Sequence, residues 1–174
     1  MRFIYGILLA LGVIVGGTAA SQAQEIAGNG NDSALIGLSA GMFNVGDDHE
    51  AGELLLDYRA EDALFGVLRP WGGVMATTDG AAYGFGGLML DVLWGENIAT
   101  TLYTAVGAFH DGDGEDLGHW VEFRSGIELS YRFDNRSRVG LNFSHMSNAD
   151  IGDDNPGAET LALTYVIPVD QIFN

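Results

Sequence analysis

The sequence predicts an all-β protein, an eight-stranded antiparallel transmembrane barrel. Polar and apolar residues alternate along most of the chain after residue 23, and a period of two is typical of strands. Turn-forming residues divide the alternation into eight segments, and eight strands can close into a small barrel without exposed edges. No run of 18 apolar residues follows residue 23, so a membrane role for that part of the chain requires strands.

The first 23 residues have the pattern of a secretory signal peptide. Arg2 precedes an apolar run over residues 3–15, and the small residues Ser21 and Ala23 mark a cleavage site after Ala23. A membrane-anchoring helix is the alternative, but the run is shorter than the ~20 residues that cross a bilayer. We therefore expect a signal peptide at 1–23 and an outer-membrane β-barrel at 24–174.

Period-two segments and turn signals place the eight strands in order along the chain. We expect them at 33–43, 51–59, 71–77, 80–92, 97–109, 118–133, 137–147 and 158–167. In the sixth strand, Glu122, Arg124, Glu128 and Arg132 share one parity, where they would neutralise each other in a polar lumen or in water. A soluble lipocalin-like barrel, which turns its apolar parity inward, therefore remains an alternative at this point.

Strand length and aromatic placement favour the membrane barrel. Strands of this length, joined by short turns at one end, match the apolar band of an outer-membrane barrel. Aromatic residues also stand at strand ends, as expected for interfacial girdles: Phe43, Tyr58, Trp71, Trp94, Phe109, Trp120, Phe133, Tyr165 and Phe173. With a periplasmic N-terminus, the acidic segments 47–50, 111–116 and 150–154 lie at the outer end, and the connection over 60–70 is longer than expected.

Charge and cysteine content exclude several functions. The 174 residues include 7 arginines and no lysine against 24 acids, a net charge of −17, which leaves almost no cationic surface for nucleic acid. Loss of Arg2 with the signal peptide makes the charge −18. The absence of cysteine rules out a disulfide scaffold, thiolate metal sites and a cysteine nucleophile.

The hairpin over residues 139–166 carries the candidate chemistry. His145 and Ser147 continue the apolar parity of its first strand, and Glu159 begins that of the second. A loop symmetric about Gly152 pairs His145 with Glu159, with Cβ atoms ~4.5–5.5 Å apart. Serine needs a neutral imidazole to accept its proton and a carboxylate to orient that imidazole, so nucleophile, base and orienter are present in order. The alternative is that these are ordinary interfacial polar residues.

The same hairpin resembles a known family. Residues 143–149 (FSHMSNA) and 155–159 (NPGAE) are similar to the signature of the outer-membrane lipid A 3-O-deacylases of the PagL type. The resemblance implies an eight-stranded barrel whose surface triad hydrolyses an ester-linked acyl chain of lipid A, at the 3-O position, without metal or cofactor. It makes Ser147 the nucleophile, His145 the base and Glu159 the orienter. It places the oxyanion hole at the Asn155 side chain and the Asn148 backbone N–H.

Together with this resemblance, the hairpin residues predict that the protein is a serine esterase. Its expected substrate is lipid A, the lipid part of lipopolysaccharide, and its expected surroundings are the lipids of the outer membrane. Ser147 is expected near the outer membrane–water boundary, facing lipid, with an apolar groove beside Phe143 and Met146. Two alternatives remain: a non-catalytic structural or adhesive barrel, and a soluble exported barrel that binds lipid in its lumen. Dimerisation stays open. Residues 111–122 match a calcium loop only in part, and a solvated acidic loop is the expectation there.

Overall fold

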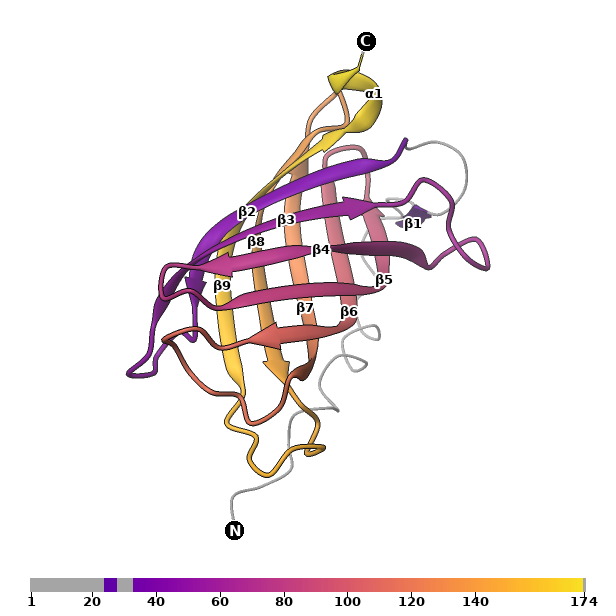
Figure 1. The fold of residues 1–174 in the computed structure, drawn as a ribbon. Helices are drawn as coiled ribbons and strands as arrows, with labels where there is room; N and C mark the ends of the chain where they lie inside the picture. Colours follow the sequence, from indigo (N-terminus) through magenta and orange to yellow (C-terminus); the bar gives the residue numbers. More distant parts are fainter. Residues whose placement is uncertain (1–23, 28–32, 174) are drawn as a thin grey trace, which may run out of the picture.

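The computed structural model describes residues 24–27 and 33–173, and its eight long strands close into one antiparallel barrel (Figure 1). The barrel strands are β2 (Leu35–Phe43), β3 (Ala51–Arg59), β4 (Arg69–Thr77), β5 (Ala82–Trp94), β6 (Ile98–His110), β7 (Val121–Arg132), β8 (Arg138–Ser147) and β9 (Ala158–Pro168). Each pairs with the next along the chain, and β9 pairs with β2 to complete the ring. The predicted fold class is confirmed.

Two short elements accompany the barrel. β1 (Gln24–Ala27) pairs with residues 91–94 of β5, beyond Met89, where the pairing of β4 with β5 ends. β1 thus provides hydrogen-bond partners for a part of β5 that β4 does not reach. α1 (Val169–Ile172) is a single helical turn that follows β9. The predicted signal peptide over 1–23 lies outside the described residues.

None of the helices that the structure describes is long and apolar enough to cross a membrane.

The apolar parity of the strands faces outward. Leu129, Leu141 and Leu163 are paired in register across β7, β8 and β9, and their exposed fractions are 57%, 58% and 62%. Such a continuous apolar outer surface over a polar interior is the arrangement of a membrane barrel. The inward apolar parity of a soluble barrel is not what the chain adopts.

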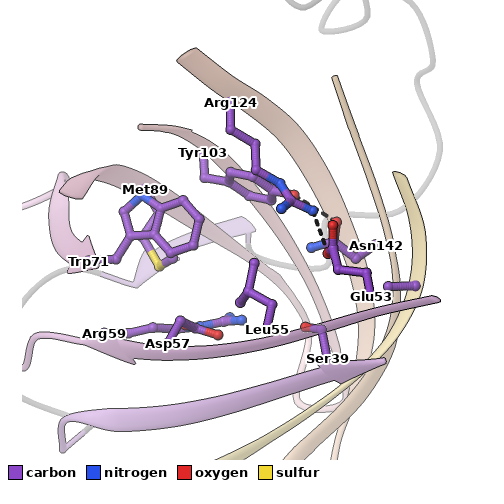
Figure 2. Close-up of a pocket in the computed structure, with 11 residues that line it drawn as sticks. Ser39, Glu53, Leu55, Asp57, Arg59, Trp71, Met89, Tyr103, Arg124 and Asn142 are labelled. Atoms are coloured by element: carbon purple, nitrogen blue, oxygen red, sulfur yellow. Dashed lines mark hydrogen bonds and ion pairs between the residues drawn. The ribbon is translucent and has the colours of Figure 1, made fainter. Parts of the chain in front are cut away.

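The interior is closed by buried ion pairs that cross the lumen. Arg124 donates to Glu53 and Arg59 to Glu128, each at 2.8 Å between nitrogen and oxygen, and Figure 2 shows the first of these pairs. Arg124 and Glu128 could neutralise each other in such a polar lumen, but each is instead paired across it. Their partners lie on β3, because closure of the barrel places β3 opposite β7.

Little space remains inside the lumen. The void among Ser39, Trp71 and Arg124 has a volume of about 10 Å³, room for roughly one water molecule. A lipid does not fit in this void (Figure 2). This part of the barrel therefore has no cavity for the lipid that a soluble lipid-binding barrel would hold in its lumen.

The aromatic girdle prediction is wrong for three of its nine residues. Phe43, Trp71 and Phe109 are 1%, 7% and 7% exposed, because each lies on the inward parity of its strand. Phe43 and Phe109 join Tyr83 and Leu117 in a buried apolar cluster. The other six aromatic residues are exposed or belong to the outer surface: Tyr58, Trp94, Trp120, Phe133, Tyr165 and Phe173.

The acidic loops gather at one end of the barrel. Segments 44–50, 78–81, 111–120 and 148–157 connect strands at the end where β2, β4, β6 and β8 finish (Figure 1). The opposite end carries segments 60–68, 95–97 and 133–137 together with α1. The longer connection over 60–68 contains a small bridge between Leu64 and Leu68, which gives it structure of its own.

Candidate active site

The candidate residues lie where β8 ends, on the outward face of the barrel. The registers of β7, β8 and β9 pair Phe123 with Ser147, Ser125 with His145, and His145 with Glu159. The pairing predicted from the loop centre at Gly152 is therefore confirmed. His145, Ser147 and Glu159 share the parity of the apolar outer surface, so all three side chains emerge beside one another.

His145 and Glu159 are joined by a hydrogen bond. The distance from Nδ1 to Oε1 is 3.0 Å, and each side chain is 46% exposed. With Nδ1 carrying its proton toward the carboxylate, Nε2 has the free lone pair that a general base needs. The carboxylate thus selects the tautomer that suits proton removal from a serine.

Ser147 is partly exposed and lies two residues beyond His145 on the same face. Two strand residues span about 6.6 Å, within reach of an imidazole that leans along the strand. Among the described residues, Ser147 Oγ makes no hydrogen bond. Catalytic hydrogen bonds often tighten only once substrate is bound.

A tight turn reverses the chain directly after the serine. Ala149 and Asp150 have φ angles of 56° and 62°, and the Ile151 N–H donates to the Asn148 carbonyl at 3.3 Å. Two consecutive left-handed residues form a type I′ turn, which matches the twist of a hairpin. The turn brings Asn148 close to Asn155 on the returning segment.

Both predicted oxyanion donors lie beside each other in this loop. The Asn148 backbone N–H donates to Asn155 Oδ1 at 3.0 Å, and Asn155 Nδ2 donates to Asp150 Oδ1 at 3.0 Å. The Asn155 amide has a second N–H that remains for a substrate oxygen. The Asn148 N–H becomes available only if the Asn155 side chain turns.

Gly157 supports the imidazole, and the sequence reasoning assigned it no role. Its φ is +73°, and a Cβ there would lie 2.8 Å from His145 Cε1. Glycine adopts this positive φ without strain, and it has no Cβ that would clash with the imidazole. The Pro156–Gly157 turn signal was a clue to the bend, but not to the packing beneath His145.

Ser125 was also overlooked. It stands opposite His145 on the side away from Glu159, and its Oγ lies 3.1 Å from Thr104 Oγ1. A polar row therefore crosses β6 to β9 within the apolar outer surface: Thr104, Ser125, His145 and Glu159. This second outward serine provides a matched control for Ser147.

The apolar surroundings differ in one residue from the prediction. Phe143 is 49% exposed and pairs with Leu161, also 49% exposed, one outward position below His145. Phe123 is 37% exposed beside Ser147. Met146 is 1% exposed and points into the barrel, because its parity is opposite to that of His145. The apolar surface beside the site is therefore formed by Phe123, Phe143 and Leu161.

The acidic loops contain local pairs. His110 Nδ1 lies 3.0 Å from Asp111 Oδ1, and this hydrogen bond lowers the pKa of Asp111. His49 lies 3.8 Å from Glu115. No three His, Asp or Glu side chains within residues 24–27 and 33–173 come together as a metal site.

Comparisons with known proteins agree with this architecture. The family model for lipid A 3-O-deacylase (PagL) matches residues 56–168. The crystal structure of the outer membrane enzyme PagL is similar, with a TM-score of 0.61 and 21% identity over 78% of this chain and 99% of that one. A de novo designed transmembrane β-barrel has a TM-score of 0.55 at 10% identity, covering 80% of this chain and 98% of the design. No curated protein matches the chain.

Proposed function

Because the chain belongs to the lipid A 3-O-deacylase (PagL) family, we propose that it is a serine esterase that removes the 3-O-linked acyl chain of lipid A in the outer membrane. The observation that carries the mechanism is the 3.0 Å hydrogen bond between His145 and Glu159 beside Ser147, on the lipid-facing parity. A carboxylate and an imidazole raise the free energy of a lipid-facing surface unless they are paired. Ionisable residues kept at such a position mark a functional site. We further propose that residues 1–23 are a signal peptide and that the mature barrel comprises 24–174.

The reaction would follow the steps of acyl transfer to serine. Ser147 Oγ attacks the ester carbonyl carbon while His145 Nε2 takes its proton. The tetrahedral intermediate collapses, and the imidazolium gives the proton to the departing sugar oxygen. Water, deprotonated by the same imidazole, then releases the fatty acid from Ser147. Glu159 stabilises the imidazolium through both half-reactions.

Negative charge on the carbonyl oxygen requires donors. The free N–H of Asn155 Nδ2 is one, and the Asn148 backbone N–H becomes the second when Asn155 Oδ1 moves away from it. Binding of substrate would thus replace one hydrogen bond within the loop by two to the oxyanion. This exchange leaves no buried donor unpaired.

Lipid A would reach the site by diffusion within the leaflet. Its acyl chain would lie on the apolar surface formed by Phe123, Phe143 and Leu161, with the ester held beside Ser147 and His145. The 4 arginines that are buried in the described part of the chain all point into the barrel, so the phosphates of lipid A meet few cations at the outer end. The partners proposed are lipid A and the surrounding outer-membrane lipids, with no metal or cofactor in the chemistry.

The test is mass spectrometry of lipid A from cells that carry the wild-type chain, Ser147→Ala, His145→Ala or Ser125→Ala. Wild type and Ser125→Ala should remove one 3-O acyl chain, whereas the other two variants should leave lipid A intact in a folded, heat-modifiable barrel. Purified wild type should stay active in excess chelator. Unchanged lipid A with wild type would instead favour a structural or adhesive barrel.

A further inference from the structure

Glu122 is buried below the active site without a partner. Its exposed fraction is 0%, and neither carboxyl oxygen makes a hydrogen bond in the described part of the chain. It precedes Phe123, the residue that pairs with Ser147, and its side chain points inward. The proposed mechanism makes no use of this group.

The charges around Glu122 do not stabilise an anion. The other 4 carboxylates that are buried among residues 33–173 are each bound to an arginine: Glu53, Asp57, Asp91 and Glu128. Arg124, two residues along the same strand, donates to Glu53 and Ser144 and not to Glu122, and the charge that acts on Glu122 from the 111–120 loop is the carboxylate of Asp116. From β5, the Tyr83 hydroxyl donates to the Glu122 backbone carbonyl at 2.9 Å, not to its carboxyl group. A carboxyl group so placed is cheaper to bury neutral, with a proton to donate.

Asn148 provides a matching acceptor. Its side chain is fully buried, and Nδ2 donates to the carbonyls of Leu117 and Asp154 at 2.7 and 2.6 Å. These two carbonyl partners determine which end of the amide is nitrogen. Oδ1 is left buried with no donor.

The strand register brings these two groups together. Phe123 with Ser147 is the last pair of the β7–β8 register, and continuing that register by one residue sets Glu122 opposite Asn148, the first residue after β8. Both residues have the inward parity, and opposed side chains have Cβ atoms about 4.5–5.5 Å apart. One hydrogen bond from a protonated Glu122 carboxyl group to Asn148 Oδ1 would satisfy both buried groups.

The Asn148 amide holds two loops together at the active site. Leu117 belongs to the β6–β7 loop and Asp154 to the β8–β9 loop. Glycines pack closely around it, since a Cβ at Gly152 would lie 3.0 Å from Asn148 Nδ2 and one at Gly118 3.3 Å. The Asn148 backbone N–H is one of the proposed oxyanion donors. Asp154 directly precedes Asn155, whose side chain is the other.

We propose that Glu122 is a positioning residue for the reaction: as a neutral acid, it donates a hydrogen bond to Asn148 Oδ1 and so fixes the loop that carries both oxyanion donors. The inference rests on the proposed function for its catalytic consequence. The hydrogen bond itself does not depend on turnover. Ionisation of Glu122 at high pH removes the donor, so kcat should fall as pH rises through that ionisation.

Glu122→Gln and Glu122→Met separate this role from packing. Glutamine donates to Asn148 Oδ1 at every pH, whereas methionine has similar length and no donor. With purified enzyme and lipid A, we expect Glu122→Gln to keep kcat within about twofold and Glu122→Met to lower it about tenfold, with KM little changed in both. The alkaline loss of kcat seen in wild type should be absent from Glu122→Gln. Equal alkaline loss in wild type and Glu122→Gln would overturn the proposal, and so would full activity of Glu122→Met.

An infrared measurement tests the protonation state without turnover. At mildly acidic pH, wild type minus Glu122→Gln should show the carbonyl stretch of one protonated carboxylic acid. A difference spectrum without that band overturns the inference, even if Glu122→Met fails to fold. Absence of lipid A hydrolysis by wild type, with the band present, would instead overturn the proposed function.

Discussion

His145 and Glu159 are 14 residues apart in the chain, yet they are direct neighbours across β8 and β9, with Nδ1 and Oε1 3.0 Å apart. A carboxylate in this position acts on the imidazole and not on the substrate. In the proposed mechanism, it keeps the proton on Nδ1 so that Nε2 is free to act as the base, and it stabilises the imidazolium that forms when Ser147 loses its proton.

Substitution of Glu159 should therefore be less damaging than substitution of the serine. Glu159→Gln keeps a hydrogen-bonding group beside Nδ1 but removes the charge that stabilises the imidazolium, so kcat should fall by less than in Ser147→Ala. Initial rates of acyl release from lipid A in detergent measure both. If Glu159→Gln is as inactive as Ser147→Ala, the role assigned to Glu159 is wrong.

Asn155 should act on the transition state more than on substrate binding. Asn155→Ala removes the side-chain oxyanion donor, and we expect kcat to fall about 10²-fold with little change in KM. Asp150→Gly, which removes the acceptor at 3.0 Å from Asn155 Nδ2 and adopts the left-handed φ of 62° without strain, should have a smaller effect. A large rise in KM with unchanged kcat for Asn155→Ala would assign this side chain to ground-state binding.

Arg59 should be important for stability. Its Nε lies 2.8 Å from Asp57 and its Nη2 2.8 Å from Glu128, all buried, so Arg59→Met leaves two carboxylates without their cation. Loss of one partner of a buried pair costs about 3–5 kcal/mol of unfolding free energy. Urea unfolding of the barrel in lipid vesicles, followed by heat-modifiable mobility, measures this loss.

Arg136→Met is the matched control for that experiment. Arg136 pairs with Asp170 at the surface, where an ion pair contributes about 0–1 kcal/mol. A similar loss in the two variants would show that the lumenal ion pairs contribute no more than surface ones.

The outward placement of Ser147 can be tested with a single cysteine, because the chain contains none. Ser147→Cys should react in whole cells with a membrane-permeant lipophilic thiol reagent or with a reagent added outside. Ser144→Cys, at a position that is 1% exposed and inward, should not react. Labelling of position 147 only from the periplasmic side would reverse the topology and the leaflet of the substrate.

Local sequence was enough for the strands and for one pairing in the site. The period of two identifies each strand and its two faces because side chains alternate strictly along extended backbone. The same rule pairs His145 with Glu159, since a hairpin register depends only on where its loop is centred. The same alternation also indicates that Phe43, Trp71 and Phe109 point inward. The girdle prediction was wrong for these three residues because it followed from their position at the strand ends alone.

Contacts between distant segments required the closed barrel. Glu53 meets Arg124 across 71 residues, and Arg59 meets Glu128 across 69, because closure brings β3 opposite β7, and no local pattern records which charges then face each other. The approach of Gly157 to His145 and the crossing of two loops at Asn148 likewise depend on how the loops fold over the rim. The sequence by itself therefore determined the strands, their faces and the pairing of His145 with Glu159. The tertiary structure decided what supports that pair, since the support comes from side chains brought together only when the ring of strands closes.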